Sequence, residues 1–330
     1  MTYSFRPLRH VGGLCLAALA AFSATYASAQ AQDLPKNIRL VVPFSPGGSN
    51  DVFARALAQR MASRNGITVV VENKPGAGGA IGAQAVATAT PDGTTLLLNS
   101  VSFSTNAAVQ AKLPYDPIKA FEPVAMLNRG PMLLVTPANA PYANVGDVLK
   151  AIRGPKKDVN FGSAGQGSTG HLAGELLNAM ATGNAVHVPY KGISNAATDM
   201  IGGNLQIMVT TAASIAGPLK GGQIRAIAVT SAQRSKFTPE LPTVGDVLPG
   251  FDVESWWGIF APAKTSRAMV DRLNQEIRAI ADTPEMRELF SRESTEPSAM
   301  TSQQFAAYVQ SEINKWRKLV KDRNIAMATE

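Results

Sequence analysis

The chain carries IRLVVPFSPGGSND at residues 38–51 and TVVVENKPGAGG at residues 68–79. In each stretch a buried-type strand runs into glycines, and a helical pattern then begins, at Val52 in the first and at Ala80 in the second. Glycine allows a sharp turn and lets a ligand approach the backbone closely. A helix start leaves N–H groups unpaired and carries positive dipole, so it attracts carboxylate or phosphate. Two such ends side by side predict a cradle for an anion.

The N-terminus is typical of a removable export signal. Arg6 and Arg9 form a basic region, and residues 11–22 are apolar but too short to span a bilayer. Residues 27–29 read Ala-Ser-Ala, a small-residue cleavage pattern, so we expect residues 1–29 to be removed. The single cysteine, Cys15, lies inside this segment. The mature chain therefore excludes disulfides, thiolate metal sites and cysteine nucleophiles.

Length and charge narrow the class of protein further. A mature chain of about 300 residues exceeds one ordinary core, so two domains are expected. The signal holds two arginines and no acid, and its removal lowers the formal charge from +7 to +5. Lysine and arginine form no long run and aromatics are few, which favours a solvated surface over nucleic-acid binding. No second apolar stretch approaches membrane length, so we expect a soluble mature protein.

Strand and helix patterns alternate along two successive parts of the chain, as in sheets with helices on both faces. A chain that leaves one α/β lobe, builds a second and returns gives a cleft between two lobes, into which both could present the carboxyl ends of parallel strands. We assign residues 33–132 and 256–330 to lobe 1 and residues 133–255 to lobe 2. The expected strands are 38–44, 68–73, 94–99, 124–127, 132–136, 159–161, 185–190, 205–210, 224–230 and 256–262, and the first helices after the opening pair are 100–110 (helix or loop), 171–180 and 192–201.

The C-terminal part is helical. Apolar residues recur at three- and four-residue steps through 270–280, and again on one face of 305–320. Thr301 and Gln304 form a capping-box start for the last helix. We expect these helices to cover the sheet of lobe 1.

Two polar residues near the first helix start have competing interpretations. Asp51 is favoured as a first-turn acid that complements the helix dipole. Ser49 either caps the helix or contacts a ligand, and the sequence does not separate the two.

Residues 165–170 spell the dinucleotide fingerprint Gly-x-Gly-x-x-Gly after a strand and before a helix. The acid that should end the next strand is missing, because Tyr190 and Lys191 stand there. A glycine-rich helix start that binds a carboxylate fits the same residues, and we favour it over a nucleotide site.

His171 and Glu175 lie one helical turn apart, and His187 offers a possible third metal ligand. No His-Glu-x-x-His pattern is present, so a helix-start histidine that bonds a ligand or Glu175 is favoured over a metal site. Lys191 either pairs with a second ligand carboxylate or lies at the rim. The Trp256–Trp257 pair is favoured as hinge or core packing. Neither a Gly-x-Ser-x-Gly elbow nor a Walker sequence occurs, so nucleophilic catalysis and phosphate-loop chemistry find little support.

The ordered motifs resemble those of the extracytoplasmic substrate-binding proteins of tripartite tricarboxylate transporters, the Bug family. The similarity covers nearly the whole mature chain. The motifs are residues 38–44 with Pro46-Gly47-Gly48 and Asp51, 71–79, Pro91-Asp92-Gly93, 113–117, 171–175, 188–192, 241–244 and 256–258.

The resemblance implies a Venus-flytrap, type II-like periplasmic-binding-protein fold of class α/β, each lobe a mainly parallel sheet flanked by helices. It implies a monomer without enzyme activity, cofactor, metal or nucleic-acid partner, which closes on a small organic carboxylate in the periplasm and delivers it to membrane permease subunits. The residues that it implies for the ligand site, with Ser100 after the third strand, are Phe44, Ser45, Gly47, Gly48, Ser49, Ala77, Gly78, Gly79, Ser100, Gly165, Ser168, Thr169, His171, Lys191 and Asn195.

One departure from the family pattern bears on the ligand. Members often carry Phe-Asp where this chain has Val209-Thr210-Thr211, and in some relatives an acid there faces the ligand. Its absence favours a plain or neutral-tailed carboxylate over a cationic or amino-acid ligand. Di- and tricarboxylates, aromatic acids and vitamins with an acid or amide tail stay open. The alternatives to transport are an exported α/β enzyme and a ligand-sensing subunit of a membrane signalling partner.

Overall fold

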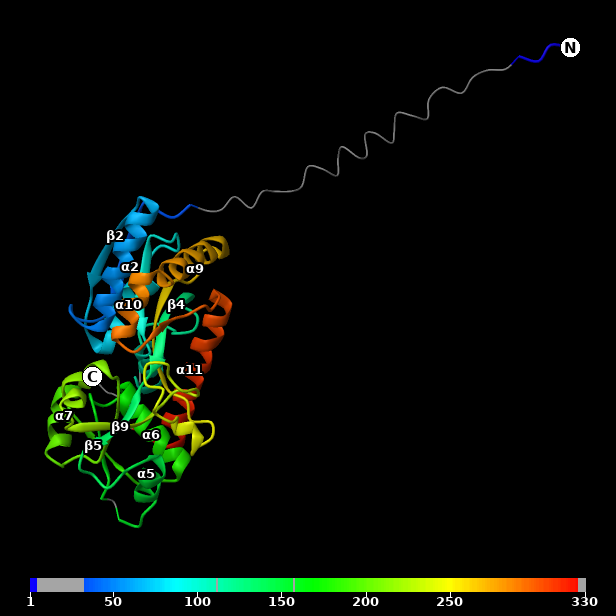
Figure 1. Cartoon of the computed structure of the whole chain (residues 1–330). Helices are drawn as coiled ribbons and strands as arrows, with labels where there is room; N and C mark the ends of the chain where they lie inside the picture. Colours follow the sequence, from blue (N-terminus) through cyan, green and yellow to red (C-terminus); the bar gives the residue numbers. More distant parts are fainter. Residues whose placement is uncertain (5–32, 111, 157, 326–330) are drawn as a thin grey trace. The chain divides into compact units, whose positions relative to one another are not determined.

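The computed structural model describes residues 1–4, 33–110, 112–156 and 158–325. Most of the predicted export signal, including Cys15 and the cleavage pattern at residues 27–29, lies outside these residues. Residues 33–330 form one compact unit, which holds all the elements described below (Figure 1). Within the described ranges no helix combines the length and the apolar character that a bilayer crossing needs.

The strands and helices alternate as the sequence predicts, with additional short helices. The first part contains β1 Asn37–Val42, α2 Ser49–Asn65, β2 Thr68–Asn73, the 3₁₀ turn η1 Ala77–Gly79, α3 Ala80–Ala87, β3 Thr95–Ser100, α4 Ser102–Val109 and β4 Phe121–Pro131. The middle part contains β5 Leu133–Pro137, α5 Val145–Ile152, β6 Asn160–Ser163, α6 Thr169–Ala181, β7 Val186–Pro189, α7 Ile193–Ile201, β8 Ile207–Thr210, η2 Ala213–Ile215, α8 Ala216–Lys220, β9 Ile224–Val229 and η3 Val244–Asp246. The last part contains β10 Glu254–Pro262, α9 Arg267–Ala281, α10 Pro284–Arg292, β11 Glu296–Pro297 and α11 Ser302–Asp322.

The strands form two sheets. The six-stranded sheet has the order β11-β4-β10-β3-β1-β2, and the five-stranded sheet has the order β7-β6-β8-β5-β9. Both sheets are mixed, whereas the sequence predicted mainly parallel ones. The reason is the path of the chain: returning β10 enters between β3 and β4 and runs antiparallel to both, and β5 runs antiparallel to β8 and β9.

Each sheet nevertheless contains a parallel trio of the same topology. In the six-stranded sheet β1 lies between β2 and β3, and in the five-stranded sheet β6 lies between β7 and β8. The first strand of each trio is thus central, and the loops after all three strands leave from one edge. Ligands of α/β proteins bind at such carboxyl edges, so this repeated topology determines where a site is expected.

Local signals set the helix ends. Gly66 ends α2 in the left-handed conformation at φ 63°, which a glycine adopts without strain. The predicted capping box of α11 is present, because Thr301 Oγ1 accepts from the N–H of Gln304 and the Gln304 side chain accepts from the N–H of Thr301. The capping box pairs N–H groups at the start of α11. The start of α2, whose N-cap is Gly48, has no such side-chain cap, so its first N–H groups stay open.

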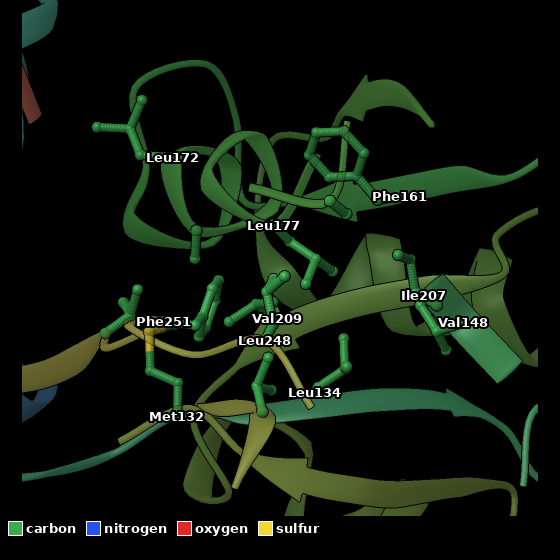
Figure 2. Close-up of a cluster of buried hydrophobic side chains, with 14 of the residues drawn as sticks. Met132, Leu134, Val148, Phe161, Leu172, Leu177, Ile207, Val209, Leu248 and Phe251 are labelled. Carbon is green, nitrogen blue, oxygen red and sulfur yellow. The ribbon is translucent and has the colours of Figure 1, made fainter. Parts of the chain in front are cut away.

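Apolar side chains cover both faces of both sheets. In the six-stranded sheet, α2, α9 and α10 cover one face and α3, α4 and α11 the other. In the five-stranded sheet, α7 and the segment after β8 cover one face. The other face carries α5 and α6, and Figure 2 shows its core, in which Leu172 and Leu177 of α6 belong to one cluster with Phe161, Leu134 and Val209 of the strands.

The last helix packs on the six-stranded sheet, as expected, and also reaches the core of the five-stranded sheet. Phe305 and Ile313 of α11 lie in the core of the six-stranded sheet, whereas Trp316 and Leu319 join the core of the five-stranded sheet (Figure 1). A helix of 21 residues is about 30 Å long, more than one sheet face needs. Helix α4 behaves in the same way, since its Val109 also lies in the second core.

Two segments cross between the sheets, one at Met132 and one between β9 and β10. Thr230, which is fully buried, ties them together: its hydroxyl accepts from the N–H of Met132 at 2.9 Å and donates to the carbonyl of Val253 at 2.6 Å. The N–H of Thr230 donates to the carbonyl of Met132, also at 2.9 Å. One side chain thus fixes the geometry of both crossings.

The tryptophan pair packs in the core, as the sequence predicts. Trp256 packs edge-on against Phe305 with ring centroids 5.8 Å apart, and Trp257 packs edge-on against Phe53 at 4.9 Å. Both indoles are buried. Neither is therefore available as an exposed stacking platform for a ligand.

Candidate functional site

The predicted site residues lie at the carboxyl edges of the two parallel trios. They come from five connections, which belong to both sheets. Phe44, Ser45, Gly47, Gly48 and Ser49 follow β1; Ala77, Gly78 and Gly79 follow β2; Ser100 ends β3; Gly165, Ser168, Thr169 and His171 follow β6; Lys191 and Asn195 follow β7.

The first glycine loop opens α2, and its N–H groups fall into two kinds. The N–H of Gly47 donates to Asp51 Oδ2 at 3.0 Å, so this predicted donor is already used. Within the described part of the chain, the N–H groups of Gly48, Ser49 and Asn50 have no hydrogen-bond acceptor. These three are the donors that this helix start offers to an anion.

Asp51 has the structural role that the sequence favoured. It is 5% exposed and accepts from Gly47, from Arg55 Nε at 3.0 Å and from Asn73 Nδ2 at 3.0 Å. The Arg55 side chain, followed by the hydrogen bonds of Gly47 and Asn73, lowers the pKa of Asp51 to about 2 against the opposing effect of burial. The carboxylate is therefore ionised and neutralised inside the protein, where it fixes the loop.

The Ser49 hydroxyl does not cap α2, and contact with a ligand stays a prediction for this residue. Its hydroxyl donates to Glu293 Oε2 at 3.2 Å, and α2 has no side-chain cap. Glu293 follows α10 and comes from a distant part of the sequence, so no local pattern predicted this contact.

The second glycine loop has an unusual backbone. Ala77, Gly78 and Gly79 all have positive φ, at 48°, 62° and 103°. Successive N–H groups in such conformations form a concave anion-binding nest. The N–H of Gly79 donates to the carbonyl of Gly76 at 2.9 Å, which removes it from the predicted donors. The N–H groups of Ala77 and Gly78 have no acceptor among the described residues.

Two side chains hold this loop through its carbonyl groups, those of Asn106 in α4 and of Gln110 directly after α4. Gln110 Nε2 donates to the carbonyl oxygen of Ala77 at 2.9 Å, and Asn106 Nδ2 donates to that of Gly78. From the sequence this segment is expected only as a short polar helix or loop. The signal for its role is a pair of amide side chains four residues apart, a spacing that brings side chains to one face of a helix.

The third glycine loop, between β6 and α6, is largely satisfied by the protein itself. The N–H of Gly165 donates to Ser163 Oγ at 3.1 Å, that of Gly167 to His171 Nδ1 at 3.0 Å and that of Ser168 to the carbonyl of Gly165 at 3.1 Å. Ser168 Oγ caps α6 by accepting from the N–H of His171 at 3.3 Å. The N–H groups of Gly165 and Ser168 are therefore not free to donate to a ligand, whereas those of Thr169 and Gly170 lack acceptors among the described residues.

The buried side chain of His171 holds this loop by accepting the hydrogen bond from the N–H of Gly167. It is 4% exposed and stacks on His187 with ring centroids 3.9 Å apart, and His187 Nε2 lies 2.7 Å from Ser163 Oγ. Burial lowers the pKa of both rings to about 4, so both are neutral at pH 7. Because Nδ1 of His171 accepts from Gly167, the proton of the neutral ring lies on Nε2.

The expected bond between His171 and Glu175 is not formed. Glu175 instead pairs with Arg323 of the segment after α11, at 3.6 Å, and burial raises the pKa of Glu175. The metal alternative loses support for the same reason, because its three candidate ligands each have another protein partner. Within the described ranges no group of three histidine, aspartate or glutamate side chains could hold a metal ion.

The start of α7 adds further open donors. Gly192 is its N-cap without a side-chain cap, and the N–H groups of residues 193–195 have no acceptor in the described chain. Lys191 is exposed and forms no ion pair with a described residue. After β8, Thr211 bonds Ser214 at 2.6 Å, which completes a sixth edge connection that the predicted site did not include.

The last turn of α4 contacts loops of both sheets. Asn106 and Gln110 hold residues 77–79, and a Cβ built on Gly167 would lie 2.8 Å from Val109 Cγ2. Loops 77–79 and 165–168 therefore share one support, although they follow strands of different sheets. This turn is thus the part of the candidate site that contacts glycine loops of both sheets.

Two surface hollows lie elsewhere. One of about 610 Å³ lies between α9, α10 and β11, and one of about 390 Å³ lies beside Arg129 and the segment 231–237. Neither contains a predicted site residue, and several charged side chains of their linings are paired, such as Lys236 with Glu296 at 2.6 Å. The unpaired backbone N–H groups described above lie at the glycine loops and not in these hollows.

Comparisons with known proteins decide the family. The profile described as "Tripartite tricarboxylate transporter family receptor" matches residues 53–325. The chain belongs to this family. It is similar to the "UPF0065 protein in tcbD-tcbE intergenic region" of Pseudomonas sp. (strain P51), with 35% identity over 95% of both chains. Its members are receptors of a transporter family, so this chain is a solute-binding protein and not an enzyme.

Solved structures agree with this assignment. The chain is similar to R. palustris Rpa4515 with adipate, with a TM-score of 0.75, 32% identity and coverage of 88% of this chain and 98% of that one. It is also similar to the periplasmic binding protein BugD, with a TM-score of 0.72, 32% identity and coverage of 88% and 99%. The two-lobed binding-protein fold predicted from the sequence is thereby confirmed, with the mixed sheets described above.

Proposed function

We propose that this receptor captures a small organic carboxylate at the last turn of α4 and delivers it to permease subunits of the tripartite tricarboxylate type. Capture takes place in the periplasm, after removal of residues 1–29. The observation that carries the proposal is the set of unpaired N–H groups at Gly48, Ser49, Ala77 and Gly78, which belong to two adjacent glycine loops.

The charges near these loops suit an anion. A carboxylate at the start of α2 would be repelled by Asp51 if that side chain were unpaired, but Arg55 neutralises it and Gly47 and Asn73 also donate hydrogen bonds to it. The open donors belong to backbone on structured elements and need no side-chain ordering. Hydrogen bonds from N–H groups to a carboxylate are charge-assisted and among the stronger ones in proteins.

The connections after the strands of the five-stranded sheet suit a ligand with more than one polar end. Lys191 is exposed and stands before the open helix start of α7, so a second carboxylate has a cation and unpaired N–H groups available there. The segment Val209-Thr210-Thr211 stands where the resemblance places an acid in some relatives, and it offers no carboxylate to a cationic group. A dicarboxylate therefore fits these residues, and the structure of a relative with adipate gives a precedent for such a ligand.

Closure requires the two lobes, residues 33–132 with 256–330 and residues 133–255, to move about the crossings at Met132 and Thr230. The ligand contacts loops of both sheets and so stabilises the closed form over the open one. The permease then distinguishes the loaded protein by its closed form. We expect a monomer in solution, which light scattering after size-exclusion chromatography measures.

Thermal unfolding with a panel of acids tests the proposal. The panel contains adipate, succinate, malate, citrate and benzoate, with arginine and EDTA as contrasting additions. One or more carboxylates should raise the melting temperature saturably, whereas arginine and EDTA leave it unchanged. Mass spectrometry of material that co-purifies with the native protein identifies the physiological acid. A panel without any stabilising carboxylate, or destabilisation by EDTA, contradicts the proposal.

A further inference from the structure

We propose that Asn106 and Gln110 are positioning residues, which hold residues 77–79 in the one conformation that leaves an N–H group open for the anion. The inference rests on the proposed function, because it concerns the same carboxylate site. It assigns a role to the last turn of α4, which follows the third strand of the trio and not the strand that precedes the loop it holds.

The loop needs external support because its backbone is unfavourable. Ala77 has a φ of 48°, a conformation that costs a residue with a Cβ free energy, and Gly78 and Gly79 continue the run of positive φ. Such a conformation persists only where the surroundings determine it. The hydrogen bonds from Gln110 to the Ala77 carbonyl and from Asn106 to the Gly78 carbonyl are the contacts that do so.

The same bonds determine where the donors point. In a trans peptide the N–H of one residue lies opposite the carbonyl of the residue before it, and the described chain has no cis bond. Since Gln110 binds the Ala77 carbonyl, the N–H of Gly78 points away from α4. Asn106 fixes the next peptide unit, whose Gly79 N–H closes the turn onto the Gly76 carbonyl at 2.9 Å. The contacts of Gln110 and Asn106 thus leave the N–H of Gly78 open and keep the N–H of Gly79 bonded within the turn.

Asn106 lies on α4 and Gln110 directly follows it, and this helix is packed into both cores. Phe103 of α4 is buried in the core of the six-stranded sheet, and Val109 is buried in the core of the five-stranded sheet. Arg317 Nε of α11 donates to the carbonyl of Ala107 at 3.2 Å. Binding groups placed by well-packed helices keep their geometry better than groups placed by loops. The positioning role therefore does not depend on the loop's own order.

Two shape-preserving variants test the inference, Gln110→Met and Asn106→Leu. Asn184→Leu is the control, because it removes an equivalent bond, from Asn184 Nδ2 to the Gly154 carbonyl at 2.7 Å, outside the site. The first measurement is hydrogen exchange of the Gly79 N–H in the ligand-free protein. The second is calorimetry with adipate, succinate, malate, citrate and benzoate.

We expect exchange at Gly79 to rise about tenfold or more in Gln110→Met and Asn106→Leu. Affinity for whichever acid the wild type binds should fall about tenfold or more. The control should change neither. Adding Ala77→Gly to Gln110→Met should recover part of the lost affinity, because glycine adopts positive φ without strain. A merely structural role of Gln110 would give no such recovery.

Exchange at Gly79 and affinity that both stay within twofold of wild type overturn the positioning role. Faster exchange with unchanged affinity overturns it as well, because the loop is then held without any effect on binding. A wild type that binds none of the acids refutes the proposed function instead, and the positioning role falls with it. The two failures are therefore distinguishable by whether the wild type binds.

Discussion

The Gly78→Ala variant tests whether the second glycine loop binds the ligand. Comparison with a control variant distinguishes a loss of affinity from a loss of stability. Gly78 has φ 62° and ψ 15°, and its N–H has no acceptor in the described chain. A Cβ at this position would lie 3.1 Å from Gln110 Nε2 and 3.3 Å from Nδ2 and Oδ1 of Asn106. The substitution therefore places a methyl group against both holding side chains, in a conformation that disfavours any Cβ.

The magnitude follows from these two facts. A non-glycine residue in the left-handed conformation costs about 1–2 kcal/mol, and relief of that strain rotates the Gly78 peptide out of position. An N–H contact to a charged group contributes about 1.5–3 kcal/mol. We therefore expect a loss of affinity of roughly 10- to 100-fold. Gly78→Val, which is β-branched and more crowded, should abolish detectable binding.

Gly66→Ala is the matched control. Gly66 has nearly the same φ, 63°, but ends α2 and has no atom within 4 Å of a built Cβ. Gly66 lies at the far end of α2, about 25 Å from the first glycine loop. Because alanine is strained in this left-handed conformation, Gly66→Ala should lose about 1 kcal/mol in free energy of unfolding and no affinity. Urea unfolding measures the first quantity and calorimetry with the identified acid the second. Equal affinities of Gly78→Ala and Gly66→Ala would refute the role of this loop.

Three further outcomes are expected. Thr230→Val should lower the free energy of unfolding by about 1–3 kcal/mol in urea titrations, because it leaves buried backbone groups at the crossing unpaired; an unchanged midpoint contradicts this role. Asp51, whose pKa is lowered from 3.8 to about 2, stabilises the protein above pH 4 and loses this effect as the pH falls toward 2. Asp51→Asn should therefore be less stable than wild type at pH 7, with a smaller difference at pH 2, and parallel pH profiles would contradict the assignment. His171 and His187, whose pKa values are lowered to about 4, should make unfolding easier as the pH falls from 6.5 toward 4; His187→Phe should flatten this dependence in thermal melts, and an equally steep profile would count against it.

The fold was readable from the sequence where burial patterns were strong. Residues 38–42 and 68–73 form parallel strands as predicted, because each is a short apolar run that ends at a glycine loop. The return of the chain at residues 256–262 was also predicted. What the sequence did not show is that β10 enters between β3 and β4, since strand order is decided by packing between distant segments.

The predicted site residues follow strands of the two parallel trios, and their contact with a ligand stays a prediction. Glycine loops after parallel strands mark the carboxyl edge, and all predicted residues lie there. Which N–H groups stay open depends on side chains that the glycine pattern does not specify. Asp51 takes the N–H of Gly47 and His171 takes that of Gly167, so two predicted helix starts offer fewer donors than their sequences suggest.

The role of α4 could not be predicted from its local sequence pattern. Residues 100–110 combine serine, threonine and asparagine with alanine and valine, which indicates no strong helix and no core. The segment becomes buried because it fills the space beside α11 between two cores, a tertiary effect. Only then do Asn106 and Gln110 acquire a function, by reaching a loop more than twenty residues earlier in the chain.

The central claim is that open backbone donors of two adjacent glycine loops receive a carboxylate. A crystal structure with the acid that co-purifies or gives the largest thermal shift tests it most directly. Carboxylate oxygens should lie about 2.7–3.2 Å from the backbone nitrogen of Gly78 and from that of Gly48 or Ser49. An acid bound elsewhere, or protein groups already bonded to these nitrogens, would contradict the claim.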